Sequence, residues 1–115
     1  MSDCIFCKIA RGEIPAGKVY EDENILAFRD IQPQRPVHIL VIPKKHITSL
    51  ATVVPGDAAV LGQMLAKAGE IAAAAGSTDG FRVIINTGRI GGQEVAHLHA
   101  HIVGGSEPVG PMLKH

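Results

Sequence analysis

Short apolar runs separated by polar turns occupy most of the chain, and one segment has the periodicity of a long helix. Lys18–Glu21 and Ile25–Phe28 have the composition of two short strands joined by an acidic turn, which is a hairpin signal. After a proline-containing loop, the β-branched run from His38 to Ile42 predicts a third strand, which Pro43 closes. The first part of the chain therefore predicts three consecutive strands.

The segment from Asp57 to Ala75 carries apolar residues at intervals of three and four, the spacing of one helical face. Asp57 suits the N-cap position, and Gly76 is a natural C-terminal stop. The apolar stripe consists of Val60, Leu61, Met64, Leu65, Ala68, Ile71 and Ala72. We expect this stripe to pack against a sheet.

Three further segments complete the predicted architecture. Phe81–Thr87 and Val95–Val103 have the pattern of strands joined by the glycine-bearing loop Gly88–Gly92, and Cys4–Arg11 that of a short helix. Five strands, with the long helix between the third and the fourth, predict an α+β fold built on a five-stranded, largely antiparallel sheet.

Composition indicates how many domains the chain forms and which kinds of binding partner it can have. The chain has 115 residues, 46% of them hydrophobic, which suits one domain with its own core. Lysine plus arginine equals aspartate plus glutamate at 11 each, which excludes the broad basic surface that nucleic acid requires but leaves room for a small anionic ligand. No apolar run approaches the roughly 20 residues that span a bilayer, and the start of the chain has no signal-peptide features. We therefore expect a cytoplasmic protein with neither a membrane nor a nucleic-acid partner.

Three histidines, His97, His99 and His101, share one face of the last predicted strand, with neighbours about 7 Å apart. The other face carries the apolar residues Leu98, Ala100 and Ile102. Packing does not require three imidazoles, so we consider a solvated face, a metal site and nucleophilic catalysis at phosphorus. In the third case a neutral imidazole attacks an activated phosphate and forms a phosphoramidate, which water then hydrolyses.

Cys4 and Cys7 form a Cys-x-x-Cys pair, which also has three interpretations. A redox pair normally follows a strand, and no strand is predicted before this one. Two incidental reduced thiols are a second interpretation, since cytoplasmic cysteines stay reduced. A structural zinc site is the third, and it needs two more ligands.

The segment His97-Leu98-His99-Ala100-His101-Ile102-Val103 resembles the signature of the histidine triad (HIT) family, and the chain is similar to the Hint branch of that family nearly end to end. The supporting segments are Ile5-Phe6, Gly12–Pro15, Ala27–Ile31, Val41–His46, Gly91–Gln93, Gly104-Gly105 and Gly110–Leu113. The resemblance implies one HIT domain over residues 1–115. The short chain and its C-terminal segment favour the Hint branch over its neighbours.

The resemblance implies hydrolysis of purine (adenosine or guanosine) nucleoside 5′-phosphoramidates to the nucleoside monophosphate and an amine, through a covalent nucleotidyl-histidine at His99. By the same resemblance His101 hydrogen-bonds the phosphate, and the backbone carbonyl of His97 accepts from the nucleophile's ring. The resemblance also implies that His38 helps to orient the triad. The alternatives are a dinucleoside polyphosphate hydrolase and a nucleotide-binding adaptor with vestigial catalysis.

The resemblance also implies a nucleotide site in which His99 and His101 take part. Asp30 would bind the ribose hydroxyls, Ile31 would lie against the base, and Asn86 would contact phosphate. The remaining phosphate contacts fall on the segment Gly92, Gln93, Glu94 and Val95. Glu94 stands where animal members carry a serine, so it is either a protonated acid or contributes only its backbone amide, and we expect the backbone role.

Some HIT proteins with this cysteine pair complete a zinc site with two histidines, which are His46 and His97 here. The resemblance thus implies structural Zn²⁺ bound by Cys4, Cys7, His46 and His97, although the chemistry itself requires no metal. As a ligand, His97 could not act as a base, and zinc would instead fix the segment that carries His99.

The branch forms homodimers through the long helix, with the C-terminal tail reaching toward the partner's active site. The helix surface here is rich in alanine, which is compatible with close packing. These alanines are Ala58, Ala59, Ala66 and Ala72–Ala75.

Overall fold

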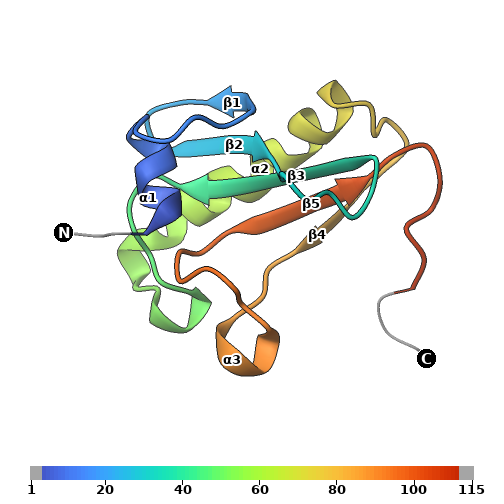
Figure 1. The fold of residues 1–115 in the computed structure, drawn as a ribbon. Coiled ribbons are helices and arrows are strands. Elements are labelled where there is room, and N and C mark those ends of the chain that lie inside the picture. Colours follow the sequence, from blue (N-terminus) through green and yellow to red (C-terminus); the bar gives the residue numbers. More distant parts are fainter. Residues whose placement is uncertain (1–3, 112–115) are drawn as a thin grey trace.

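The computed structural model describes residues 4–111 of the chain, and Figure 1 shows its fold. The elements in chain order are α1 (Ile5–Ala10), β1 (Lys18–Glu21), β2 (Ile25–Arg29), β3 (Val37–Pro43), α2 (Ala58–Ala74), β4 (Arg82–Ile84), α3 (Gly88–Gly91) and β5 (Ala100–Gly104). Residues 1–3 lie outside the described part of the chain. So do Met112 and Leu113, the last two residues of the Gly110–Leu113 segment that supports the resemblance. Within residues 4–111, no helix combines the length and hydrophobicity that crossing a bilayer requires.

The strands form one five-stranded sheet in the order β1-β2-β3-β5-β4, and every neighbouring pair is antiparallel. This confirms the predicted α+β fold with a five-stranded antiparallel sheet, one long helix and a short N-terminal helix. In the central pair, Leu40 of β3 stands opposite His101 of β5, and His38 stands opposite Val103. The register therefore brings two histidines from distant parts of the chain close to each other.

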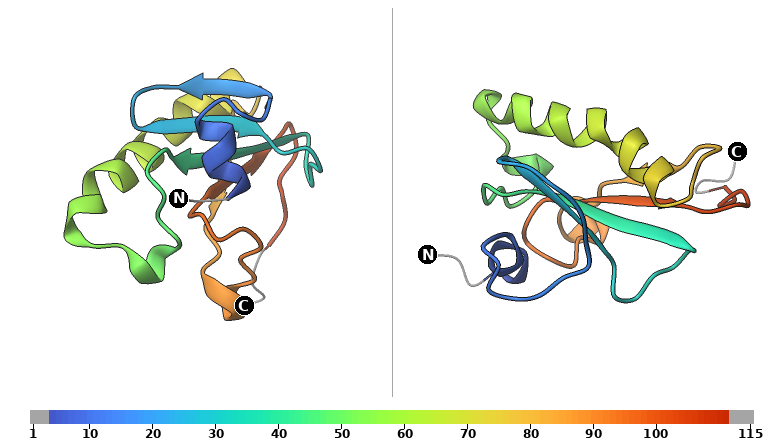
Figure 2. Two further views of the ribbon diagram at one scale, coloured as in Figure 1. Left: turned by 60° about the vertical axis from the view of Figure 1, so that its left-hand side comes forward. Right: turned by 90° about the horizontal axis from the view of Figure 1, so that it is seen from above.

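Helices cover opposite faces of the sheet, α2 on one side and α1 on the other (Figure 2). Because side chains alternate along a strand, each strand contributes to both layers. Ile39 and Val41 of β3 belong to the core under α2, while Leu40 and Ile42 pack in a second apolar cluster with Phe6 of α1. The histidine-bearing face of β5 therefore lies on the α1 side.

The predicted strand Val95–Val103 is wrong over its first half, because β5 begins only at Ala100. The N–H of Leu98 donates to the carbonyl of Ile47 at 2.6 Å instead of to β3. Pro43, which ends β3, has no N–H for a strand ladder, and its carbonyl lies 2.8 Å from the His97 ring. The alternation of faces nevertheless continues through the bend, because Leu98 is buried in the α2 core with Ala100.

The region between α2 and β5 also differs from the prediction. The strand predicted over Phe81–Thr87 is limited to Arg82–Ile84, since its last pair with β5 joins Ile84 to His101, one residue after β5 begins. The predicted loop Gly88–Gly92 is the short helix α3, which Gly92 ends in the left-handed conformation at φ +78°. A glycine tolerates this conformation without a steric penalty.

Helix α2 agrees with the predicted Asp57–Ala75 to within one residue at each end. The role of Asp57 differs, however, because its carboxylate accepts from the N–H of Val54 and pairs with Lys45 at 2.7 Å, and makes no capping bond to α2. Ala72 is fully buried against the sheet, so it is not part of the alanine surface of the helix. The expectation that Leu65 packs against the sheet with the rest of the stripe is wrong, because Leu65 is 54% exposed.

Candidate functional site

His99 lies in the bend just before β5 and is buried, with 5% of its surface exposed. Its Nδ1 lies 2.7 Å from the backbone carbonyl oxygen of His97, the contact that the resemblance implies. A carbonyl only accepts, so in the neutral ring the proton sits on Nδ1 and Nε2 carries a lone pair. This is the protonation pattern that a nucleophilic imidazole needs.

His38 and His101 form a second hydrogen-bonded unit beside His99. The backbone N–H of Gln34 donates to Nδ1 of His38 at 3.0 Å, so in the neutral ring the proton of His38 sits on Nε2. That Nε2 lies 2.9 Å from Nδ1 of His101. His101 therefore accepts through Nδ1 and keeps its own proton on Nε2, where it can donate to an anion.

Burial lowers the pKa of two histidines, His101 and His97. Desolvation is the main cause that lowers the pKa of His101, and positive charge on His99 or His38 would lower it further. The carboxylates of Asp30 and Glu94 act in the opposite direction. Desolvation also lowers the pKa of His97, which is completely buried. The direction of both shifts favours rings that serve as hydrogen-bonding groups without a positive charge.

A cavity of about 420 Å³ opens beside His99 and His101, within the range of small-ligand sites. Predicted residues Asp30, Ile31, Glu94 and Val95 line it, together with the two histidines. Its other lining residues are mostly apolar and include Ile5, Phe6, Ile9, Ile14, Phe28 and Leu40. A pocket that combines apolar side chains with imidazoles and carboxylates suits a nucleotide, whose base is flat and apolar and whose phosphate is charged.

A larger cavity of about 530 Å³ lies between β4 and the tail after β5, where Arg82, Glu107 and Pro108 line it. Among residues 4–111, no histidine lines this cavity. The chemistry-bearing side chains therefore gather in the smaller one.

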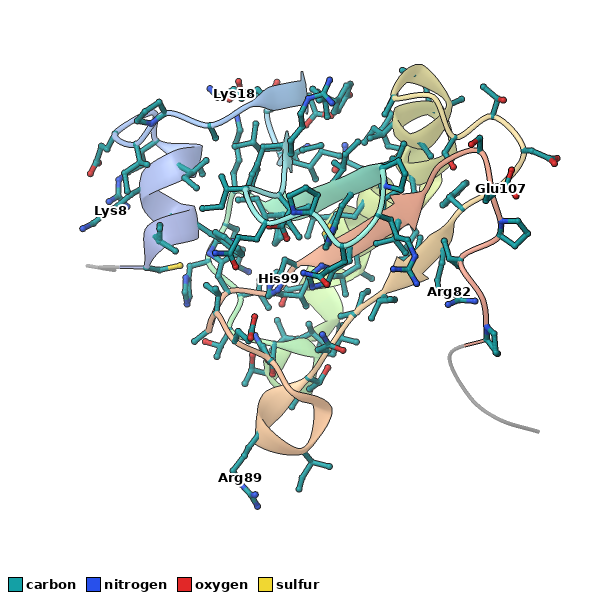
Figure 3. All side chains as sticks on the ribbon, turned by 45° about the vertical axis from the view of Figure 1, so that its right-hand side comes forward. Lys8, Lys18, Arg82, Arg89, His99 and Glu107 are labelled. Carbon is teal, nitrogen blue, oxygen red and sulfur yellow. The ribbon has the colours of Figure 1, made fainter. Side chains whose placement is uncertain are left out.

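Three of the predicted nucleotide-binding residues, Asn86, Gly92 and Gln93, do not line the pocket. The side-chain amide of Gln93 donates to the carbonyls of Thr48 and Val95 and accepts from the N–H of Gly88. Its own backbone N–H donates to the carbonyl of Gly88, so Gln93 shapes the loop. Figure 3 shows His99 near the middle of the molecule and Arg89 at the outer end of α3, well away from it.

Sequence reasoning missed several groups that build the site. The ring of Phe6 packs edge-on against the His99 ring at 5.1 Å between centroids, and against the His97 ring at 5.9 Å. The Gln34 N–H and the Pro43 carbonyl set the tautomers of His38 and His97. Backbone groups leave no trace in a residue pattern, whereas the spacing of Phe6 and Ile9 on the predicted helix was a usable signal for a buried face.

The four residues expected to bind zinc come together at the N-terminal end of α1. The ligand atoms of Cys4, Cys7, His46 and His97 all lie within 4.8 Å of one another. Nδ1 of His97 is 3.4 Å from each sulfur, and Nδ1 of His46 is 3.1 Å from the Cys7 sulfur. Tetrahedral zinc with ordinary bond lengths separates sulfur and nitrogen ligands by about 3.5 Å, so this donor set fits a metal.

The protonation states in the cluster fit a metal as well. The Pro43 carbonyl accepts from Nε2 of His97, which leaves a lone pair on Nδ1, the nitrogen that faces both sulfurs. No disulfide joins Cys4 and Cys7. Desolvation is the main cause that raises the pKa of the Cys4 thiol, which favours the neutral thiol while no cation lies beside it.

The HIT domain family model matches residues 11–108, which include His38, His99 and His101. The chain belongs to the HIT family. The protein HitA of Neisseria gonorrhoeae is 57% identical over 104 residues, which cover 90% of this chain and 97% of HitA. The purine nucleoside phosphoramidase of Escherichia coli (strain K12) is 49% identical over 114 residues, which cover 98% of this chain and 95% of that protein.

Solved structures of HIT proteins share the fold. A histidine triad protein from Clostridium difficile superposes with a TM-score of 0.89 and 47% identity, over 96% of this chain and 97% of that one. A HIT family hydrolase from Legionella pneumophila Philadelphia 1 has a TM-score of 0.86 and 52% identity, over 91% of this chain and 95% of that one. The arrangement of sheet and helices in this HIT protein is therefore that of its family.

Proposed function

We propose that this HIT protein hydrolyses purine nucleoside 5′-phosphoramidates to a nucleoside monophosphate and an amine. The observation that carries the proposal is the bond from Nδ1–H of His99 to the His97 carbonyl at 2.7 Å, which leaves a lone pair on Nε2 in the nucleotide-sized cavity. The Escherichia coli relative named purine nucleoside phosphoramidase supports the choice of substrate.

The reaction has two displacements at the α-phosphorus. Nε2 of His99 attacks the phosphorus, a bond from nitrogen to phosphorus forms, and the bond to the substrate amine breaks as that amine takes up a proton. Water then attacks the nucleotidyl-histidine, the phosphorus–His99 bond breaks, and the water's proton leaves. The products are the nucleoside monophosphate and neutral His99.

The other pocket residues bind and orient the nucleotide in this proposal. His101 donates from Nε2–H to a phosphate oxygen, because His38 occupies its Nδ1. One carboxylate oxygen of Asp30 accepts from the Gln32 N–H at 2.8 Å and the other lies 3.4 Å from Nε2 of His38, so the carboxylate is held at the pocket, where we expect it to bind the ribose hydroxyls. Ile31, 94% exposed at the rim, would be covered by the base. Glu94 and Val95 line the phosphate end, where we expect their backbone amides to act.

We further propose that the Cys4–Cys7–His46–His97 cluster holds Zn²⁺. With four protein ligands the ion has no open position, so it would cross-link the segments that carry those ligands and take no part in the reaction. His97 contributes to catalysis through its backbone carbonyl alone.

We also propose a homodimer that forms through α2. The outward face of this helix is small and apolar, and Leu65, 54% exposed, projects from it. Its other exposed members are Gly62, Ala66, Gly69 and Ala73, spaced by three and four residues. Such a face lets a second helix approach closely and bury Leu65.

Turnover of adenosine 5′-monophosphoramidate by the wild type and by His99→Ala tests the proposal. We expect the variant to lose at least about 10³-fold in kcat, because the nucleophile is gone, while adenosine monophosphate still binds. The wild type quenched at alkaline pH should carry a nucleotidyl group on His99, detected by mass spectrometry. Comparable turnover by His99→Ala would refute the mechanism.

The same assay separates the alternatives. A wild type that cleaves a diadenosine polyphosphate faster than the phosphoramidate would be a dinucleoside polyphosphate hydrolase. A wild type that binds adenosine monophosphate and turns over neither compound would be a binding protein.

A further inference from the structure

Helix α1 forms one wall of the nucleotide pocket, and the same helix with its N-cap residue Cys4 carries half of the cysteine–histidine cluster. Ile5, Phe6 and Ile9 line the pocket, while Cys4 and Cys7 face His46 and His97. The two sites therefore share a six-residue helix.

Such a helix depends on its neighbours for its position. A helix of this length has too few hydrogen bonds to persist alone. Its backbone bonds stay within the segment, as from the Lys8 N–H to Cys4 and from the Arg11 N–H to Cys7. Packing of Phe6 and Ile9 in the apolar cluster, together with the cysteine–histidine cluster, thus holds α1 against the sheet.

The cluster ties α1 to two distant segments. Cys7 lies 39 residues before His46 and 90 before His97, and His46 and His97 both belong to the body of the domain. A metal bound by all four ligands would cross-link α1 to that body. Phe6, between the two cysteines, would then be held against the His99 ring at 5.1 Å.

We propose that metal occupancy of this cluster sets the affinity of the pocket for purine nucleotides, with Cys4 and Cys7 as positioning residues that hold the α1 wall in place. The inference rests on the proposed function, since it takes the pocket to bind a purine nucleotide. The wall contacts the apolar part of the ligand, whereas His99 donates from Nδ1–H to the His97 carbonyl, and the His97 ring is held by the Pro43 carbonyl as well as by the cluster. Loss of metal therefore weakens nucleotide binding more than it slows the chemical step.

The test measures binding of adenosine monophosphate to the full chain by calorimetry, first loaded with one equivalent of Zn²⁺ and then after chelation. We expect chelation to raise Kd by about tenfold or more, because part of an apolar wall is lost, and readdition of Zn²⁺ to restore it. In steady-state assays KM should rise by a similar factor, with a smaller change in kcat. Hydrogen exchange of residues 4–16 should speed up on chelation.

Cys4→Ser, which keeps three of the four ligands, should reproduce the chelated state. Met64→Ala is the matched control, because Met64 is buried in the α2 core and does not line the pocket. This control should lower the melting temperature and leave Kd unchanged, which separates a local wall from general destabilisation. Co²⁺ in place of Zn²⁺ reports occupancy through its thiolate absorption.

Equal Kd for the loaded and chelated protein would overturn the proposal, as would failure of the wild type to bind Zn²⁺ or Co²⁺. A loaded protein that does not bind adenosine monophosphate would count against the proposed function instead. Hydrogen exchange would still decide the effect on α1 in that case, because unchanged exchange of residues 4–16 on chelation would refute it.

Discussion

Each histidine of the triad segment has one ring nitrogen fixed by a group outside its own ring. The His97 carbonyl fixes Nδ1–H of His99, and the Pro43 carbonyl fixes Nε2–H of His97. The pair of His38 and His101 is oriented by one backbone N–H, that of Gln34. At the scale of single residues, neighbouring histidines therefore differ in tautomer: His99 carries its proton on Nδ1, and the others carry theirs on Nε2.

These tautomers lead to a spectroscopic prediction. Nitrogen-15 chemical shifts of the imidazoles at neutral pH should show the proton on Nδ1 of His99 and on Nε2 of both His38 and His101. A His99 ring protonated on Nε2 would contradict the assignment of that nitrogen as the nucleophile. Spectra of His99→Ala identify its signals by their loss.

Acidification should destabilise the fold through His101. Burial lowers its pKa below the ordinary value of 6.5, so between the folded pKa and 6.5 the unfolded chain binds more protons than the folded one. The free energy of unfolding is thus highest above that range and decreases as the pH falls through it. We expect His101→Gln, which does not titrate, to show a shallower decrease in urea unfolding between about pH 7.5 and about pH 5.5. Equal slopes would show that His101 makes no such contribution.

At the scale of elements, the hydrophobic pattern predicts the helices and strands that bury one face of their own residues. The stripe on α2 gives its bounds to within one residue, because half of its surface must face the sheet. The alternation in β3 gives a strand for the same reason. Residues 95–99 keep a strand-like alternation and yet leave the ladder, since Leu98 bonds to Ile47 and Pro43 offers no N–H.

The site divides in the same way. The triad and Asp30 follow from side-chain types in a recognisable order, and the structure brings His99, His101 and Asp30 to one pocket. Gln34 acts through its backbone N–H and Pro43 through its backbone carbonyl. Other residue types could supply the same backbone groups, so the residue type carries no signal for these contacts. Helix α3 could not be predicted, because a glycine-rich segment has the composition of a loop whether or not it forms one helical turn.

The contact between β5 and the loop after α2 gives a prediction for one element junction. A Cβ on Gly104 would lie 2.1 Å from Oγ of Ser77. That hydroxyl donates to the Gly80 carbonyl and accepts from the Gly105 N–H, so it cannot move freely. We expect Gly104→Ala to reduce the free energy of unfolding by about 1–3 kcal/mol, measured by urea denaturation. Gly17→Ala is the control, because its Cβ would meet Arg29 at an ordinary 3.7 Å, and equal losses in both variants would refute the clash.

At the scale of the whole molecule, the proposed dimer through α2 predicts the behaviour of surface variants. Leu65→Glu places a charge on the outward face of α2 and should convert a dimer into monomers, measured by sedimentation velocity. Val19→Glu is the control, because Val19 is also an exposed apolar residue but belongs to β1 and not to α2. A wild type that sediments as a monomer at micromolar concentration, or an unaffected Leu65→Glu, would contradict the dimer.

The wide spacing of the cysteine–histidine cluster along the chain has a consequence for biosynthesis. Cys4 and Cys7 are translated first, His46 follows, and His97 comes 93 residues after Cys4. The nascent chain thus exposes two thiols long before the remaining ligands exist, and the ligand set becomes complete only after β4 has been synthesised. We expect the N-terminal helix to be the last part of the domain to dock, although it is the first part to be made.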